Sequence, residues 1–291
     1  MGSENQQEIE IVPEQADPSS TGCASCPVHH AANLHKLGVD MENWDFIAAL
    51  AGNPNTGKST VFNALTGLRQ HTGNWPGKTV TRAEGGFEYR DQRYKLVDLP
   101  GTYSLLATSI DEEIARDFIL FGQPDVTVVV VDATRLERNL NLVLQVLEIT
   151  GRVVISLNLM DEAKRHQLKI DHRRLARDLG VPVVPTAARY DRGMEELVQA
   201  ISEVARGETV GDPFQVKYDH PELDQAVSEL VEEIQEVFPE IPNARWVALR
   251  ILDGDRRIIQ AVRDGELGIL QSASARSVDE GKTALKSGYK Q

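Results

Sequence analysis

The feature that constrains this chain most is a glycine-rich pattern, Gly52-Asn53-Pro54-Asn55-Thr56-Gly57-Lys58-Ser59. It follows a short apolar run, Phe46–Ala51, which is typical of a buried strand, and it opens a segment with helical periodicity, Lys58–Thr66. A G-x-x-x-x-G-K-[ST] pattern between a strand and a helix is a P-loop, whose glycines let the backbone wrap a phosphate chain. Successive N–H groups and the helix N-terminus supply positive potential there. The sequence therefore predicts a polyphosphate site in preference to an ordinary glycine-rich turn.

The P-loop also suggests roles for single residues. We expect the Lys58 ammonium group to reach the β- and γ-phosphates of a nucleotide and the Ser59 hydroxyl to ligate Mg²⁺. The residues expected to contact the nucleotide in this loop are Gly52, Asn53, Pro54, Asn55, Thr56, Gly57, Lys58, Ser59 and Thr60. A P-loop alone does not distinguish ATP from GTP, so the base must be selected elsewhere in the chain.

A candidate base-selecting motif is Asn158-Leu159-Met160-Asp161, which follows the apolar run Val153–Leu157. Ligands of parallel α/β sheets bind at the carboxyl ends of strands, where this motif falls. A carboxylate there accepts the N1–H and the N2 amino group of guanine, whereas adenine would leave it desolvated and unpaired. We predict that Asp161 selects guanine and that Asn158 braces the loop or contacts the base. The pocket is expected to be completed by Thr186, Ala187 and Ala188, with the Ala188 N–H near guanine O6.

A third motif, Asp98-Leu99-Pro100-Gly101, follows the strand-like segment Tyr94–Val97. We expect Asp98 to hold Mg²⁺ through water and the Gly101 N–H to meet the γ-phosphate. The three motifs come in the order P-loop, D-x-x-G and N-x-x-D, each after a strand. That order indicates a GTP-binding protein far more strongly than any one motif does.

A stretch rich in glycine and proline, His71–Thr81, lies between the P-loop and Asp98. We predict that it is a loop that switches between ordered and disordered forms. Thr79 is the candidate for the threonine that completes the Mg²⁺ shell when a γ-phosphate is present, and Thr81 is the alternative. Lys58, Thr79, Gly101 and Asn55 are the residues expected to take part in hydrolysis.

Strand-like and helical segments alternate over residues 44–207, which predicts an α/β fold of the P-loop GTPase kind: a mostly parallel sheet with helices on both faces. The expected strands are Phe46–Ala51, Phe87–Tyr89, Tyr94–Val97, Val126–Val131, Val153–Leu157 and Val181–Val184, with a hairpin turn at Asp91-Gln92. The expected helices are Lys58–Thr66, Asp111–Phe121 with Gly122 as C-cap, Arg138–Thr150, Asp171–Leu179 between caps Asp171 and Gly180, and Met194–Ala205.

The rest of the chain has a different character. Residues 1–43 are expected to form a flexible tail, since Gln, Glu, Ser and Pro dominate its start, although Ala31–Leu37 has a helical pattern. A linker at Gly207–Pro213 precedes a small helical domain, predicted at 213–270 with helices Leu223–Phe238, Ala244–Leu252 and Arg256–Val262. Residues 219–240 hold eight acids and no Lys or Arg, which we interpret as a solvated helix face. Residues 271–291 are expected to be a second flexible tail.

Charge and composition exclude several classes of function. The formal net charge of −13 argues against a general DNA or RNA binder, which needs a basic face. No apolar run approaches the ~20 residues of a spanning helix. Two cysteines are too few for a disulfide scaffold, and the N-terminus has no signal-peptide pattern. We therefore expect a cytosolic protein or a cytosolic portion of a larger one.

The amino-acid residues in these motifs resemble those of the cytosolic GTPase region of the bacterial ferrous iron transport protein B (FeoB) family. The resemblance runs from about Phe46 to Gly207, and the helical segment after it agrees with the family's helical domain, which is thought to tune GDP release. The motifs that carry it are Gly73-Asn-Trp-Pro-Gly-Lys-Thr79, Asp98-Leu-Pro-Gly-Thr-Tyr-Ser-Leu105 and Val131-Asp-Ala-Thr-Arg-Leu-Glu-Arg-Asn-Leu140, together with the P-loop and Asn158-Leu-Met-Asp161.

The resemblance implies more than the residues themselves. It implies slow, Mg²⁺-dependent GTP hydrolysis coupled to Fe²⁺ import at the cytoplasmic face of the bacterial inner membrane. The implied partners are guanine nucleotide, a FeoB-type membrane permease domain, a small cytosolic Feo protein and further copies of the chain, with no nucleic acid. It also implies a K⁺ ion at Asn55, which would offset charge developing between the α- and γ-phosphates. The alternative is that Asn55 only braces the loop.

Two positions depart from common GTPase patterns. Thr102 follows Gly101, where Ras-like GTPases carry a water-orienting Gln; the FeoB family shares this absence, so other groups must position the water. Leu159 follows Asn158, where many GTPases have a Lys whose stem stacks on the base, so nucleotide binding is expected to be weaker.

The N-terminal region holds a separate candidate site, Cys23, Cys26, His29 and His30. These are ligand types for Zn²⁺ or Fe²⁺, and the alternative is a redox-active or incidental C-x-x-C pair.

Three functional hypotheses follow from the whole sequence. The first is a GTP-hydrolysing motor or switch of iron import. The second is a nucleotide-controlled conformational switch whose hydrolysis is incidental. The third, a ribosome- or tRNA-associated GTPase, is disfavoured by the acidic charge.

Overall fold

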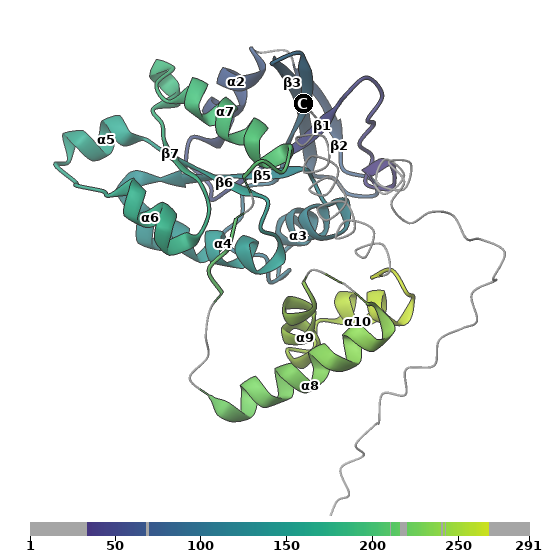
Figure 1. Ribbon diagram of the computed structural model, residues 1–291. Coiled ribbons are helices and arrows are strands. Elements are labelled where there is room, and N and C mark those ends of the chain that lie inside the picture. Colours follow the sequence, from purple (N-terminus) through teal and green to yellow (C-terminus); the bar gives the residue numbers. More distant parts are fainter. Residues whose placement is uncertain are drawn as a thin grey trace, which may run out of the picture. The chain divides into compact units, whose positions relative to one another are not determined.

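The computed structural model describes residues 34–67, 70–209, 211–215, 220–239, 241 and 243–267. The described residues divide into two compact units, one reaching Pro221 and the other beginning at Glu222. The first unit contains a seven-stranded sheet and the second contains only helices (Figure 1).

The sheet has the strand order β2-β3-β4-β1-β5-β6-β7. Strands β4, β1, β5, β6 and β7 run parallel, while β2 and β3 pair antiparallel at one edge. The mostly parallel sheet predicted from the sequence is therefore confirmed. The strands are β1 (Phe46–Gly52), β2 (Gln70–Asn74), β3 (Thr81–Tyr89), β4 (Gln92–Asp98), β5 (Val126–Asp132), β6 (Val153–Asn158) and β7 (Val183–Pro185).

Helices cover both faces of the sheet, with α2 and α7 on one face and α3 and α4 on the other (Figure 1). Between Lys58 and Ala205 the α-helices are α2 (Lys58–Thr66), α3 (Ile110–Gly122), α4 (Leu136–Ile149), α5 (Met160–Arg165), α6 (His172–Leu179) and α7 (Met194–Ala205). Two short 3₁₀ segments, Ala133–Arg135 and Ala188–Tyr190, follow β5 and β7. The prediction of helices on both faces is confirmed.

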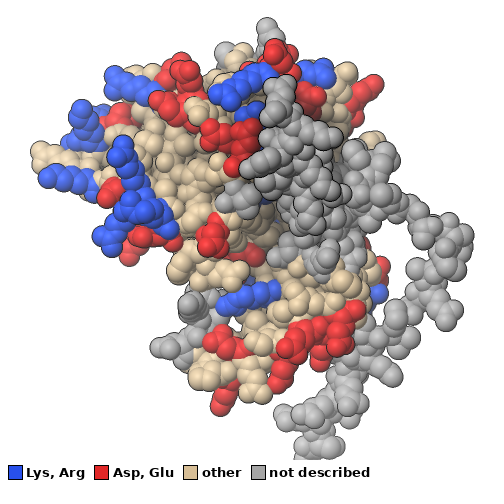
Figure 2. Space-filling view, in the orientation of Figure 1, with Lys and Arg blue, Asp and Glu red and all other residues tan. Residues whose placement is uncertain are grey.

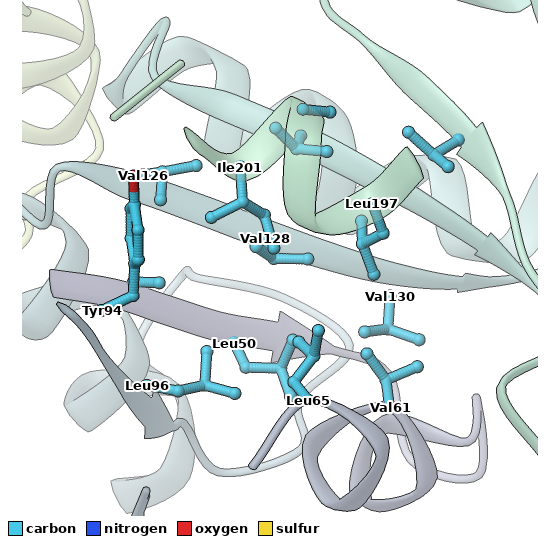
Figure 3. Packing of buried hydrophobic residues seen from close by; sticks show 14 of the residues in the cluster. Leu50, Val61, Leu65, Tyr94, Leu96, Val126, Val128, Val130, Leu197 and Ile201 are labelled. Atoms are coloured by element: carbon cyan, nitrogen blue, oxygen red, sulfur yellow. The ribbon is translucent and has the colours of Figure 1, made fainter. Parts of the chain in front are cut away.

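The core between the sheet and the helices α2 and α7 is apolar and tightly buried. Leu50 and Val128 from the sheet meet Val61 of α2 and Leu197 of α7 there (Figure 3). Each of these side chains is fully buried, and burying one stabilises the fold by roughly 1.5–3 kcal/mol. The amphipathic patterns of α2 and α7 therefore fix the two helices that hold the P-loop and the last strand in place.

Three helices begin and end at the predicted residues, whereas β3 begins at Thr81, well before the predicted start at Phe87. Helices α2, α7 and α9 have the predicted bounds, and α6 lies between the predicted caps, with the Asp171 carboxylate accepting from the Arg174 N–H at 2.9 Å. Donation from the Arg174 N–H also lowers the pKa of Asp171.

Three local predictions are wrong. The hairpin between β3 and β4 turns at Arg90-Asp91, which both have positive φ, and not at Asp91-Gln92, because Gln92 already pairs with Tyr89. Gly122 lies inside α3 and the left-handed cap is Gln123. The expected loop at His71–Thr81 begins as strand β2, since His71 to Asn74 pair with Arg82 and its neighbours in β3.

Part of the region expected to be a flexible tail is packed against the first unit. Leu34 and Val39 are fully buried, and the carbonyl groups of Leu37 and Gly38 accept hydrogen bonds from Arg82. The predicted helix at Ala31–Leu37 falls partly outside the described residues; its described part has a helical turn at 34–36.

The second unit consists, in its described part, of α8 (Pro221–Val237), α9 (Ala244–Leu252) and α10 (Arg256–Arg263). Acidic side chains gather along α8, as Figure 2 shows, while its apolar Val227 and Ile234 are buried. This pattern agrees with the interpretation of a solvated acidic face. None of the helices described here combines the length and apolarity needed to span a bilayer. The predicted domain boundaries stay predictions.

Candidate functional site

The P-loop joins β1 to α2 in the way that its glycines and turn residues allow. Asn55 and Gly57 take up positive φ values of 67° and 81°, and the Thr56 hydroxyl donates to the Asn53 carbonyl at 2.9 Å. The first hydrogen bond of α2 runs from the Thr60 N–H to the Gly57 carbonyl, so the N–H groups of Gly57 to Ser59 are not used inside the helix. Within the described residues the buried Asn53 amide nitrogen also has no partner. The loop therefore offers several unused donors to an anion.

Lys58 lies across the P-loop from the end of β4. Its ammonium group forms an ion pair with the Asp98 carboxylate and donates to the Leu99 carbonyl at 2.7 Å. Burial raises the pKa of Asp98, and the neighbouring Lys58 charge offsets only part of that rise. Because the predicted roles of Lys58 and Asp98 are to hold a phosphate and Mg²⁺, each must exchange its present partner when a nucleotide binds.

The segment after Asp98 is tied to β1 and to α4. The Thr102 N–H donates to the Gly52 carbonyl at 3.2 Å, and the Thr102 hydroxyl donates to the Ser104 carbonyl at 2.7 Å. The Gln145 side chain of α4 accepts from the Leu105 N–H at 2.6 Å and from the Ser104 hydroxyl. Gly101 lies against the P-loop, where an added Cβ would stand 3.6 Å from Pro54. The structure thus brings the P-loop and the D-x-x-G motif together, with the Thr102 hydroxyl directed into its own loop.

Asn158 connects the P-loop to the loop after β7. Its amide nitrogen donates to the Thr56 carbonyl at 3.0 Å, and its amide oxygen accepts from the Ala188 N–H at 3.2 Å and from the Thr186 hydroxyl at 3.3 Å. The Thr186 hydroxyl also lies 2.9 Å from the Ser156 hydroxyl. The Ala188 N–H, predicted to approach guanine O6, is used here by Asn158. Glycine is required at position 57, because a Cβ atom added there would lie 2.4 Å from the Asn158 amide nitrogen.

A cavity of about 900 Å³ opens beside these residues. Asp161, Thr186 and Ala187 form part of its wall, together with Lys164, His172 and Arg192. The Asp161 carboxylate, 19% exposed, is 3.6 Å from the exposed Arg165 guanidinium. The N-x-x-D motif bends at Leu159, which has a left-handed φ of 63° and is the N-cap of the short helix α5. The sequence did not predict this helix. Three of the residues expected to select the base, Asp161, Thr186 and Ala187, therefore line one recess at the carboxyl end of the sheet, while Asn158 and Ala188 are not among its lining residues.

Thr79 lies in an exposed bend between β2 and β3, and Thr81 begins β3 opposite Asn74. The Trp75 N–H donates to the Val80 carbonyl at 3.0 Å, which closes this bend. In the described part of the chain no hydrogen bond links Thr79 to the P-loop. The structure therefore leaves this predicted Mg²⁺ ligand on a separate loop.

The donor groups suit the predicted cation. Mg²⁺ prefers oxygen ligands, and the Asp98 carboxylate stands beside the P-loop with its charge offset by Lys58. Ser59, at the exposed start of α2, adds a hydroxyl on the same loop. The residues Cys23, Cys26, His29 and His30 lie outside the described residues. Among the residues that are described, no three acidic, histidine or cysteine side chains form a metal-binding group.

Gln145, Trp75 and Arg82 shape the loops of the site, and the sequence analysis did not identify them. Gln145 holds the segment after Gly101, while Trp75 and Arg82 anchor the Thr79 loop. Only the position of Trp75 inside the quoted Gly73–Thr79 motif gave any signal. Gln145 lies far along the chain from the Ser104-Leu105 segment that it holds. Arg82 is close to Thr79 in sequence, but its partners Leu37 and Gly38 are distant, so no local pattern could reveal the role of either residue.

Comparison with known proteins agrees with this geometry. Residues 46–201 match the family model described as ferrous iron transport protein B, and residues 220–287 match the FeoB cytosolic helical domain. The Fe(2+) transporter FeoB of Escherichia coli (strain K12) is 45% identical over 213 residues, which cover 71% of this chain and 26% of the transporter. The chain thus spans about a quarter of the length of the curated relatives it matches.

Solved structures show the same likeness. The cytosolic domain of L. pneumophila FeoB is 34% identical with a TM-score of 0.68, and the match covers 80% of this chain and 93% of that one. A mutant of S. thermophilus NFeoB bound to mGDP is also 34% identical, with a TM-score of 0.66, and the match covers 79% of this chain and 89% of that one. The similarity therefore extends through both the sheet unit and helical residues.

Proposed function

Because this chain belongs to the ferrous iron transport protein B family, we propose that it binds GTP and GDP and hydrolyses GTP with Mg²⁺. The observation that carries the proposal is the joining of three motifs by direct contacts. Lys58 of the P-loop pairs with Asp98, and Asn158 bonds to both Thr56 and Ala188. A structural relative bound to mGDP supports the guanine assignment.

The residues divide into those that bind and those that act on the terminal phosphate. P-loop N–H groups and Lys58 neutralise the phosphates, while Asp161 accepts the guanine N1–H and N2 amino group. Ser59, Asp98 and Thr79 would hold Mg²⁺, which offsets negative charge on the phosphates when bound. The Gly101 N–H is proposed to contact the γ-phosphate. Since the Thr102 hydroxyl is bonded to the Ser104 carbonyl, backbone or switch-loop groups position the attacking water.

We further propose that a K⁺ ion bound at Asn55 speeds hydrolysis. Asn55 is exposed on the P-loop and has a left-handed backbone conformation, with a φ of 67°. A cation there would offset charge that develops between the α- and γ-phosphates. Hydrolysis should be faster in K⁺ than in Na⁺ of equal concentration, and Asn55→Ala should remove the difference. Equal rates of the unaltered protein in both salts would exclude this part of the proposal.

At the level of the cell, we propose that the nucleotide cycle powers or gates Fe²⁺ import, through a FeoB-type permease domain at the cytoplasmic face of the inner membrane. The curated relatives are Fe(2+) transporters, of which this chain covers about a quarter. A small cytosolic Feo protein and further copies of the chain are the other expected partners. Uptake of radioactive Fe²⁺ by cells whose gene carries Lys58→Ala should fall to the level of a deletion strain.

A second candidate function is a conformational switch in which hydrolysis is incidental. The bond from the Thr102 hydroxyl to the Ser104 carbonyl favours it, because a hydroxyl donating within its own loop does not orient an attacking water. Single-turnover hydrolysis separates the two functions. A rate that Lys58→Ala does not reduce would assign the turnover to background chemistry and leave only the switch.

Calorimetry tests the central proposal most directly. The chain should bind GDP in the presence of Mg²⁺ and show no heat with ADP, since adenine cannot pair with Asp161. Asp161→Ala should weaken GDP binding by about tenfold or more, as the site loses its paired acceptor. Glu162→Ala, next to it on α5, is the matched control and should retain affinity. Equal affinity for GDP and ADP would overturn the guanine assignment.

A further inference from the structure

A short segment ahead of the family domain is built into the sheet unit. The family model begins at residue 46, yet Leu34 and Val39 are fully buried. The Val39 N–H donates to the Leu34 carbonyl at 2.8 Å, which closes a turn, and an added Cβ on Gly122 of α3 would lie 3.5 Å from Leu34. We call residues 34–40 the N-terminal strap. The burial of Leu34 and Val39 and the closeness of Leu34 to Gly122 show that packing holds the strap against α3.

Two cations of the sheet hold the strap by its carbonyl groups. Arg82 of β3 donates to the Leu37 carbonyl at 3.0 Å and to the Gly38 carbonyl at 2.6 Å. Lys95 of β4 donates to the Asp40 carbonyl at 2.6 Å. The Glu84 carboxylate pairs with both cations, at 2.7 Å from each. Hydrogen bonds from charged donors are stronger than neutral ones, so these bonds attach the strap firmly at its C-terminal end.

The same Arg82 also contacts the loop that carries Thr79. Its guanidinium lies 5.4 Å from the centre of the Trp75 ring, which is 4% exposed and packs edge-on against Phe118 of α3 at 5.5 Å. The Trp75 backbone closes the bend around Thr79 through its bonds to Lys78 and Val80. Arg82 therefore links the strap to the anchor of the Thr79 loop.

Gly38 brings the strap into direct contact with that loop as well. An added Cβ at this position would meet the Arg82 Nη1 at 2.5 Å and the Pro76 ring at 2.8 Å. Pro76 follows Trp75 in the loop. The strap thus fits between Arg82 and the loop closely enough that only glycine is accommodated, which its φ of 81° also favours.

From these contacts we propose that the N-terminal strap, acting through Arg82 and Trp75, pre-orders the Thr79 loop and thereby favours triphosphate over diphosphate binding. The inference rests on the proposed GTP-binding function. Only a nucleotide with a γ-phosphate engages Thr79, so only its binding has to order this loop. A loop that is already held loses less conformational entropy when it closes. Arg82 is a positioning residue in this scheme, and the N-terminal strap regulates the relative affinity for triphosphate and diphosphate.

The test compares two glycine variants of the full chain. Gly38→Ala places a methyl group against Arg82 and Pro76, while Gly207→Ala, at a φ of 70° with nothing within 4 Å, imposes a similar backbone strain at an open position. Affinities for GDP and for a non-hydrolysable GTP analogue are measured by titration. Gly38→Ala should weaken the analogue by about three- to tenfold and change GDP by less than about twofold. Gly207→Ala should leave the ratio of the two affinities unchanged.

A second variant keeps the proposal testable if Gly38→Ala does not fold. Arg82→Lys retains the charge but loses the planar fork that reaches two carbonyls and covers Trp75. It should lower the analogue-to-GDP affinity ratio in the same direction. An unchanged ratio in folded Arg82→Lys protein overturns the proposal. Failure of the unaltered chain to bind either nucleotide would instead contradict the proposed function, so the two failures are distinct.

Discussion

The base end and the phosphate end of the candidate site differ in how far their hydrogen bonding is complete. At the base end, Asn158 and Thr186 are each 1% exposed and are bonded to one another, and Asn158 is also bonded to the P-loop and to Ala188. At the phosphate end, Ser59 and Thr79 are exposed, and Lys58 is paired with Asp98. The base end has to release only the Ala188 N–H from Asn158, whereas the phosphate end has to exchange the charged partner of Lys58.

This difference indicates how the two ends would respond to a ligand. A base that meets the Ala188 N–H displaces one hydrogen bond to Asn158, and this exchange is the same for GDP and GTP, so guanine recognition should contribute equally to both nucleotides. Phosphate binding must draw Lys58 away from Asp98 and the Leu99 carbonyl, and it therefore couples to the position of the D-x-x-G segment. Variants at the base end should affect both nucleotides alike, whereas variants at the phosphate end should separate them.

The largest effect is expected from Lys58→Ala. The variant removes the cation predicted to hold the β- and γ-phosphates and leaves Asp98 without its partner. Single-turnover hydrolysis should slow by about 100-fold or more, and the GTP analogue should lose more affinity than GDP. Arg174→Ala, which removes an exposed cation of α6 that does not line the recess, is the matched control. Equal losses for the two nucleotides would show that Lys58 does not distinguish the γ-phosphate.

Asn158→Ala should have the next largest effect, and it tests the base end. The variant leaves the Thr56 carbonyl and the Ala188 N–H without a partner in a buried region. The free energy of unfolding should fall by about 1–3 kcal/mol in urea denaturation. Affinity for GDP and for the GTP analogue should fall by the same factor. A loss confined to the GTP analogue would contradict the separation of the two ends.

The base end could be predicted from sequence more fully than the phosphate end, for a physical reason. Parallel strands bring their carboxyl ends to one edge, so the order of strands and motifs already placed Asn158 and Thr186 near the P-loop. Regular apolar periodicity gave the bounds of α2 and α7 for the same reason: packing against the sheet leaves little freedom.

The Thr79 loop was harder to predict because its conformation depends on pairing with other segments of the chain. Its Gly and Pro content indicated a loop, but β2 forms there by pairing with the next strand, β3, although Gln70–Asn74 lacks the alternating apolar pattern that marks a strand. The burial of Leu34 likewise depends on α3, far along the chain, and the polar residues ahead of it suggested only a tail. Long-range pairing by Arg82 supplies what composition could not indicate.

A smaller effect is expected from the titration of Asp98. Burial raises its pKa above the usual value of 3.8, so the carboxyl group takes up a proton at a higher pH than an exposed aspartate does. The stability that the Asp98 carboxyl group contributes is fully present below its ordinary pKa of 3.8 and is lost as the pH rises through its raised pKa in the folded protein. Mg²⁺ binding needs the ionised carboxylate. The Mg²⁺-dependent part of GDP affinity should therefore decline as the pH falls through the raised pKa of Asp98. Titrations with and without Mg²⁺ at several pH values measure this decline, and Asp98→Asn should abolish it.

Thr102→Val should have the smallest effect, and it decides whether the phosphate end uses this side chain. The substitution keeps the approximate shape of the side chain and removes the hydroxyl, which donates to the Ser104 carbonyl and accepts from the Ser104 N–H. Stability should fall by about 1–2 kcal/mol, the net worth of two hydrogen bonds, while the hydrolysis rate stays within about twofold. Thermal unfolding and single-turnover kinetics on the same preparation measure both. A rate lowered tenfold with unchanged stability would mean that the hydroxyl turns toward the attacking water when nucleotide is bound, and the phosphate end would then rearrange further than the exchange at Lys58 requires.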